Sequence, residues 1–244
     1  MAVIAVYNLK GGVGKTTLAV NLAWCAAQLA ARRTLLWDLD PQAGATFLLG
    51  ATPWRDTAQS VFARDVAAAK LIHQTDYARL SVLPADASLR GLDQFFFTLG
   101  KRKRLARLLE GLTGSFDRIV LDCPPGLTET TEQVMRAADI ILVPVIPSPL
   151  SRRALEEVVQ HIAQHHAGRA AILPVFSMVD RRRVLHKAAL AANPDWPVVP
   201  MASAVEQMGL HRAPVGCFAA SSPAADAFAY LWRAIERKLA DRKA

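Results

Sequence analysis

The distribution of apolar and polar residues along the chain predicts strands that alternate with helices. Short apolar runs without polar alternation are typical of buried parallel strands, and Ala- and Leu-rich helical patterns separate them. Strands are predicted over residues 2–7, 34–37, 80–83, 116–122, 139–145, 170–179 and 196–201. Helices are predicted over residues 15–31, 150–165 and 223–242, and a less readable Ala-rich pattern favours helix over 57–73. We therefore expect one α/β domain over residues 1–244, with a doubly wound, mostly parallel sheet and helices on both faces.

The stretch between the first strand and the first helix reads Lys10-Gly11-Gly12-Val13-Gly14-Lys15-Thr16-Thr17. Its glycines let the backbone curl so that successive N–H groups point at a ligand, and the helix start adds unpaired donors. In such a loop the lysine lies along the β- and γ-phosphates of ATP and the following hydroxyl coordinates Mg²⁺. The candidate ATP ligands are Gly11, Gly12, Val13, Gly14, Lys15, Thr16 and Thr17, with Thr16 also a candidate Mg²⁺ ligand.

Lys10 occupies the position where the general phosphate-binding loop has its first glycine. The string K-G-G-x-G-K-T resembles the deviant Walker A loop of the ParA/MinD family of partitioning and positioning ATPases, and most of all the small ParA proteins without an N-terminal helix-turn-helix domain. The resemblance implies that Lys10 reaches the nucleotide of a partner subunit, so that two ATP molecules are sandwiched in a homodimer. The alternative is a solvated lysine beside a glycine turn.

The second predicted strand ends in Asp38-Leu39-Asp40-Pro41-Gln42, at the sheet edge where open α/β folds bind ligands. Strand alternation places Asp38 and Asp40 on the same side, toward the phosphate loop. The resemblance implies that Asp40 positions or activates the attacking water and contacts Mg²⁺ through water, while Asp38 supports it. The alternative is that Asp40 caps the turn before Gln42.

Another strand ends in Asp122-Cys123-Pro124-Pro125-Gly126, the pattern of a Walker B segment. We expect Asp122 to hold a Mg²⁺-bound water and the Pro-Pro-Gly turn to sense the γ-phosphate. Family members often have serine in place of Gly126. Cys123 has no partner for metal or redox chemistry in the sequence, so we interpret it as a small core residue.

Toward the C-terminus the resemblance is weaker. It implies that Ser177 or Met178 lies near the adenine base and that the loop after Pro200 borders it.

The net charge of +8 favours association with polyanions. Candidate contacts to DNA phosphates are Arg181, Arg182, Arg183, Lys187, Arg212 and Arg233. A salt-bridged helix start is the alternative for the three consecutive arginines. A second basic run, residues 101–104, opens a predicted helix and is either a solvated face or a further DNA contact.

Two patterns near helix ends allow other interpretations. The C-terminal helix has an apolar stripe formed by Phe228, Leu231, Trp232, Ile235 and Leu239. It suits either MinD-like membrane attachment or docking on the sheet, and its ordinary width favours docking. His161 and His165 have a spacing that could clasp a metal, but no acidic or cysteine partner lies nearby in the sequence, and the helix dipole favours histidine there anyway.

The sequence has no signal-peptide pattern or membrane-length apolar stretch, and its three cysteines suit free thiols, so we expect a cytoplasmic, nucleoid-associated protein. The resemblance implies slow ATP hydrolysis stimulated by a ParB-like or other cargo adaptor, and nonspecific DNA binding by the ATP-bound dimer. The cargo could be a plasmid, a chromosome or a protein assembly. Because the first strand starts at residue 2, sequence-specific repression by an N-terminal domain is not expected. A metabolic P-loop ligase or kinase is the alternative class of enzyme.

Overall fold

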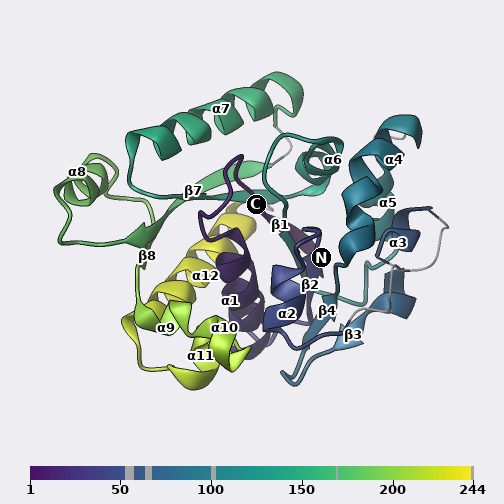
Figure 1. Ribbon diagram of the computed structural model, residues 1–244, viewed down its shortest axis with the longest axis horizontal. Coiled ribbons are helices and arrows are strands. Elements are labelled where there is room, and N and C mark those ends of the chain that lie inside the picture. The colour runs from purple at the N-terminus through teal and green to yellow at the C-terminus, as the bar shows by residue number, and fades with distance from the viewer. Residues whose placement is uncertain (53–57, 64–67, 100–102, 169, 243–244) are drawn as a thin grey trace.

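A computed structural model describes residues 1–52, 58–63, 68–99, 103–168 and 170–242 (Figure 1). Eight strands form one sheet in the order β3-β4-β2-β5-β1-β6-β7-β8. The strands are β1 (Ala2–Val6), β2 (Thr34–Asp38), β3 (His73–Gln74), β4 (Leu80–Leu83), β5 (Arg118–Asp122), β6 (Ile140–Val145), β7 (Ala171–Val179) and β8 (Val198–Pro200). Every neighbouring pair is parallel except β3 with β4. The predicted mostly parallel, doubly wound sheet is confirmed.

Helices cover both faces of the sheet (Figure 1). The longer ones are α1 (Lys15–Gln28), α4 (Leu92–Leu99), α5 (Arg104–Glu110), α6 (Glu129–Ala137), α7 (Pro149–His165), α8 (Val184–Ala192) and α12 (Pro223–Asp241). The short ones are α2 (Gly44–Leu48), α3 (Ser60–Ala63), α9 (Ser203–Glu206), α10 (Met208–His211), α11 (Val215–Phe218) and the 3₁₀ turns η1 (Ala68–Leu71) and η2 (Ala87–Gly91).

Two apolar cores, one on each face, explain why the strands are apolar throughout. Along β1, Val3 and Ala5 belong to one core, whereas Ile4 and Val6 belong to the other. The helices α1 and α12 pack on the second core, and residues of α4, α5, α6 and α7 pack on the first. A strand buried on both faces has no polar side, so its sequence shows no alternation.

The helical pattern over residues 57–73 is confirmed for the described residues of α3 and η1, but it does not extend to residue 73, where strand β3 begins. β3 pairs antiparallel with β4 at the edge of the sheet, so the chain reverses direction between these two strands. Residues 53–57 and 64–67 lie outside the described ranges.

The second basic run is only partly described, because Lys101 and Arg102 lie outside the described ranges. Arg104 begins α5, and its Nε atom donates a hydrogen bond to the Phe62 carbonyl oxygen at 3.1 Å. At least this arginine therefore contributes to packing.

The C-terminal helix α12 docks on the sheet, as its stripe favours. Phe228, Leu231, Trp232, Ile235 and Leu239 are all buried in the second core. Arg118, at the start of β5, pairs with Glu236 of α12 at 2.8 Å. Its stripe is therefore not exposed to a membrane. No helix among the described residues is long and apolar enough to span a bilayer.

Candidate functional site at the carboxyl edge of the sheet

The loop between β1 and α1 is held in place by Asn8, which is fully buried. Its Nδ2 atom donates to the Pro144 carbonyl oxygen at 2.7 Å, and its Oδ1 atom accepts the backbone N–H of Lys10 at 2.9 Å. Gly12 and Gly14 have φ angles of +70° and +88°, a region that favours glycine. Asn8 was not predicted as a site residue, because its signal in the sequence is no more than a polar residue directly after an apolar strand.

Lys15 folds back over this loop. Its Nζ atom donates a hydrogen bond to the Lys10 carbonyl oxygen at 2.8 Å, and the residue is only 7% exposed. Burial lowers the pKa of Lys15, while the nearby carboxylates of Asp122 and Asp40 act in the opposite direction. The Lys15 ammonium group is thus placed close to two of the predicted acidic residues.

Lys10 points elsewhere. Its Nζ atom donates a hydrogen bond to the Leu150 carbonyl oxygen at 2.8 Å, near the start of α7. Within the chain, the Lys10 side chain therefore contacts α7. That Lys10 reaches the nucleotide of a partner subunit stays a prediction.

Asp38 and Asp122 lie opposite each other at the ends of β2 and β5, and both are buried. The Asp38 carboxylate accepts hydrogen bonds from the backbone N–H and the hydroxyl of Thr46 in α2, at 2.9 and 2.8 Å. Burial raises the pKa of Asp38 to about 6. Asp38 therefore anchors α2, which agrees with a supporting role.

Both carboxylate oxygens of Asp122 are buried and have no hydrogen-bond partner among the described residues. Burial and the neighbouring Asp38 carboxyl raise the pKa of Asp122 well above its usual value, whereas the nearby Thr16 hydroxyl and Lys15 ammonium act in the opposite direction. A carboxylate with free oxygens beside a hydroxyl is the type of donor set that Mg²⁺ and its water ligands prefer. These residues fit a Mg²⁺ ion held by Thr16 and, through water, by Asp122.

Asp40 is half-buried, and its Oδ1 atom accepts the backbone N–H of Gln42 at 2.9 Å. This is the turn-capping contact that the sequence offered as the alternative. The same carboxylate also lies close enough to Lys15 to act on its pKa. The hydrogen bond with Gln42 uses one carboxylate oxygen of Asp40. Capping the turn is therefore compatible with a role of the other oxygen in positioning the attacking water.

The residues predicted to border the base lie on the neighbouring strands β7 and β8. Ser177 is buried, and its Oγ atom has no partner among the described residues. Met178 has a φ angle of +54°, and its Cε atom lies 3.6 Å from the place where a Cβ atom on Gly14 would sit. The register sets Val179 beside Pro200. Met178 therefore lies beside Gly14 of the loop, and Pro200 lies one strand further along the same edge.

The Pro-Pro-Gly turn is tied to the loop through Gly126. Its carbonyl oxygen accepts hydrogen bonds from the hydroxyls of Tyr7 at 3.1 Å and Thr131 at 3.3 Å, and its N–H donates to the Leu9 carbonyl oxygen at 2.9 Å. Gly126 has a φ angle of +89°. Sequence analysis did not identify Tyr7 as a contact, because an aromatic residue at the end of a buried strand is ordinarily core.

The predicted DNA contacts do not all come together. Arg181, Arg183 and Lys187 are exposed around the start of α8, just after β7, and Arg182 beside them pairs with Asp180 at 2.9 Å.

Arg212 lies on another element, over the ring of Phe47 in α2 at 4.7 Å. Arg233 of α12 lines a groove with Leu29, at the far end of α1. That end is roughly 21 Å from the loop, since α1 has 14 residues. Arg233 therefore lies near the end of α1 that is opposite the glycine loop.

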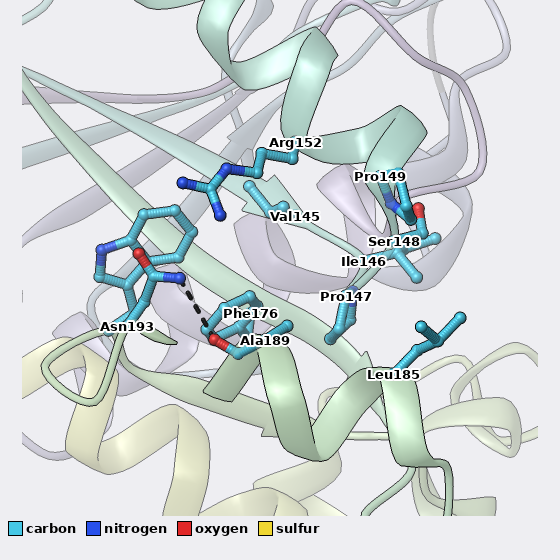
Figure 2. Close-up of a pocket in the computed structure, with 11 residues that line it drawn as sticks. Val145, Ile146, Pro147, Ser148, Pro149, Arg152, Phe176, Leu185, Ala189 and Asn193 are labelled. Carbon is cyan, nitrogen blue, oxygen red and sulfur yellow. Dashed lines mark hydrogen bonds between the residues drawn. The ribbon is translucent and has the colours of Figure 1, made fainter. Parts of the chain in front are cut away.

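An apolar cavity of about 230 Å³ lies between the β6–α7 connection and α8 (Figure 2). Phe176 and Trp196 line it, and Asn193 at its rim donates a hydrogen bond to the Ala189 carbonyl oxygen. The lining residues come from β6, the β6–α7 connection, α7, β7 and the α8 region, and none of them belongs to the glycine loop.

The sequence of this chain is similar to those of known proteins. A family model described as an AAA domain matches residues 1–172. The chromosome partitioning protein ParA of Caulobacter vibrioides is 34% identical over 197 residues, which cover 76% of this chain and 72% of that protein. The chain belongs to the ParA/MinD family.

Other members of the ParA/MinD family match over shorter regions. The sporulation initiation inhibitor protein Soj of Bacillus subtilis is 39% identical over 147 residues, covering 59% of this chain and 57% of Soj. The matched region therefore spans little more than half the length of that relative.

Solved structures share the fold over nearly the whole chain. A Cyanothece McdA variant in complex with ATP has a TM-score of 0.81 at 21% identity, covering 98% of this chain and 96% of that one. The septum site-determining protein MinD of Pyrococcus horikoshii, complexed with Mg-ADP, has a TM-score of 0.80 at 24% identity and covers 100% and 98%. Cobyrinic acid a,c-diamide synthase of Mycobacterium smegmatis, with an ATP analogue and magnesium, has a TM-score of 0.81 at 28% identity and covers 97% and 94%.

Proposed function

We propose that this ParA/MinD-family protein is a ParA-like ATPase that hydrolyses ATP to ADP and phosphate and uses the nucleotide to control a homodimer. The observation that carries the proposal is the buried, unpartnered carboxylate of Asp122 beside Thr16 and Lys15, at the mouth of a glycine loop. Burying a carboxylate without hydrogen-bond partners costs folding free energy unless a ligand binds its oxygens. Relatives solved with ATP, an ATP analogue or ADP, two of them with magnesium, support the same reading.

In this proposal the loop N–H groups from Gly11 to Thr17 and the Lys15 ammonium group bind the phosphates. Thr16 and, through water, Asp122 would hold a Mg²⁺ ion, which would supply positive charge beside the phosphate oxygens. Asp40 orients the attacking water, and its position near Lys15 supports this role. Ser177, Met178 and Pro200 border the base, a role that the position of Met178 beside the loop supports.

We further propose that two subunits close around two ATP molecules, with Lys10 of each reaching the other's nucleotide. A dimer of subunits with net charge +8 carries a nominal +16, because 8 + 8 = 16. Salt-dependent affinity for DNA phosphates rises with the number of cations engaged together, so dimerisation converts weak contacts into useful affinity. Arg181, Arg183 and Lys187, exposed on one side of the molecule, are the strongest candidates for these contacts.

The proposed role is to partition or position a cargo on the nucleoid, with a ParB-like or other adaptor stimulating slow hydrolysis. The ParA relatives, named as chromosome partitioning proteins, support this assignment. A MinD-like membrane role for α12 is disfavoured, since the stripe that would enter the membrane is buried in the core.

The decisive experiment measures DNA retention and phosphate release together. We expect binding to DNA-cellulose only with ATP and Mg²⁺, steep loss of binding with salt, and phosphate release with DNA alone as the added component. Retention on anionic liposomes but not on DNA would favour the MinD-like alternative. Hydrolysis that requires an added small-molecule acceptor would instead assign a metabolic P-loop ligase or kinase.

A further inference from the structure

Three side chains outside the phosphate loop bring their metal-binding atoms together between α6 and the end of α7. They are Glu132, His161 and His166, and one ligand atom of each lies within 4.8 Å of the others. His161 Nε2 is 2.5 Å from Glu132 Oε1, and His166 Nε2 is 3.0 Å from Glu132 Oε2. Both imidazole rings therefore direct the same nitrogen at one carboxylate.

This cluster changes the interpretation of the histidines. The spacing of His161 and His165 does not define the cluster: His165 is exposed, and its Nδ1 atom donates to the His161 carbonyl oxygen at 3.1 Å. The helix ends at His165, and His166 adopts a φ angle of −136° that departs from the helix. Its ring is buried beside Glu132. The acidic partner that the local sequence lacked comes from α6, 29 residues before His161.

The chemistry of the three donors suits a first-row transition metal. Two imidazoles and a carboxylate form a common ligand set for Zn²⁺ and related ions. Donors about 2.1 Å from a tetrahedral ion lie roughly 3.4 Å from one another, a spacing that small side-chain rotations reach from the observed one.

The surroundings of the cluster orient the Glu132 carboxylate and leave His161 beside a cavity. Arg136 pairs with Glu132 Oε2 at 2.8 Å, one helical turn along α6, and holds the carboxylate in place. A cavity of about 460 Å³ lies directly beside His161 and is lined also by Tyr7, Leu127 and Gln164. Of the three donors, His161 lines this cavity, which leaves room for water beside its ring.

We propose that Glu132, His161 and His166 bind a divalent transition-metal ion of the zinc class, which bridges α6 and α7. The site is distinct from the proposed Mg²⁺ position at Thr16 and Asp122. Because α6 begins two residues after Leu127 and so directly follows the Pro-Pro-Gly turn, the ion fixes the helix that this turn leads into. The proposal does not depend on the ATPase assignment.

The test titrates tag-free protein with Zn²⁺ and Co²⁺ in the presence of millimolar Mg²⁺. Cys217 is an exposed thiol and a competing ligand, so all variants carry Cys217→Ser. We expect one equivalent of Zn²⁺ to bind at micromolar concentration and to raise Tm, with EDTA reversing the rise. Co²⁺ should give a visible absorption band of a four- or five-coordinate site.

His161→Gln should weaken Zn²⁺ binding at least tenfold and remove the Co²⁺ band, and His166→Gln should do the same. His165→Gln is the matched control, being an exposed histidine of the same helix end, and it should leave both signals unchanged. If His166→Gln fails to fold, the partly exposed His161 decides the question. Absence of Zn²⁺ binding at 100 μM, or equal binding by His161→Gln and the control, would overturn the proposal.

Discussion

The ammonium group of Lys10 donates a hydrogen bond to the Leu150 carbonyl oxygen across 140 residues of sequence. The contact is exposed, and a bond of this kind contributes about 1 kcal/mol. Lys15, by contrast, is bonded inside the loop that it helps to form. The first lysine of the loop can therefore leave its contact at little cost, whereas the second is part of the loop's own structure.

This difference predicts separate effects for the two lysines. Lys10→Ala should leave nucleotide affinity of the single subunit within about threefold, yet abolish ATP-dependent dimerisation in light scattering. Lys15→Gln should reduce nucleotide binding itself by at least tenfold, because it removes the charge facing the phosphates. An ATP-dependent dimer of normal strength in either variant would rule out the sandwich arrangement.

Asp40→Ala should reduce phosphate release by about 10²- to 10⁴-fold, the range typical for loss of a residue that handles the attacking water. ATP-dependent dimerisation should persist or increase, because the variant binds ATP without consuming it. Asp195→Ala, which removes an exposed carboxylate away from the loop, serves as the control and should hydrolyse ATP normally. Hydrolysis by Asp40→Ala at the control's rate would leave Asp40 as a turn cap only.

The salt dependence of DNA binding tests the basic residues after β7. Each phosphate contact contributes about 0.9 to the slope of log K against log salt on duplex DNA. Replacing Arg181, Arg183 and Lys187 together with alanine should reduce that slope by about 2 to 3 per subunit. Arg233→Ala should not change it, since Arg233 lies beyond the far end of α1. The reverse pattern would move the DNA surface to α12.

At Gly216, α11 approaches α1 so closely that we expect a larger residue there to destabilise the fold. A Cβ atom at this position would lie 2.3 Å from the ring of Trp24, so the ring must shift. Gly216→Ala should lower the free energy of unfolding by about 1–3 kcal/mol, the usual cost of overpacking. Gly209→Ala is the matched control, because nothing lies within 4 Å of its added methyl group. In denaturant titrations the control should be neutral or slightly stabilised.

The raised pKa of Asp38 predicts how stability depends on pH. Burial raises this pKa from 3.8 to about 6, so the folded protein takes up the proton more readily than the unfolded chain. The ionised Asp38 carboxylate therefore lowers the free energy of unfolding above pH 6. This loss becomes smaller as the pH decreases toward 4 and the group takes up a proton. As the pH falls from 7.5 to 4.5, the wild type should gain free energy of unfolding relative to Asp38→Asn. A constant difference across that range would contradict the assignment.

Most of the fold and the outline of the candidate site could be predicted because their signals are local. The apolar runs gave the central strands, with ends within about two residues, and the glycine loop is contiguous in sequence from Lys10 to Thr17. Asp40 and Asp122 were identifiable because each follows such a strand, and parallel strands end at the same edge.

The residues that were missed depend on contacts across the fold. Asn8 matters through the Pro144 carbonyl oxygen, 136 residues away. Glu132 meets His166 only because α6 and α7 pack side by side, and His166 faces inward only because the helix has ended. Residue spacing within a single helix or strand cannot predict contacts between residues so far apart in the sequence.

The two opposed carboxyl groups of Asp38 and Asp122 have a further consequence for the stability of the chain. They place two mutually repelling acidic groups inside the protein at adjacent strand ends. A divalent cation bound at that point relieves the repulsion, and its binding free energy adds to the free energy of folding. Ligand occupancy and resistance to unfolding are therefore coupled at this edge, so that thermal protection by Mg²⁺ and nucleotide should be lost most completely when Asp122 is replaced.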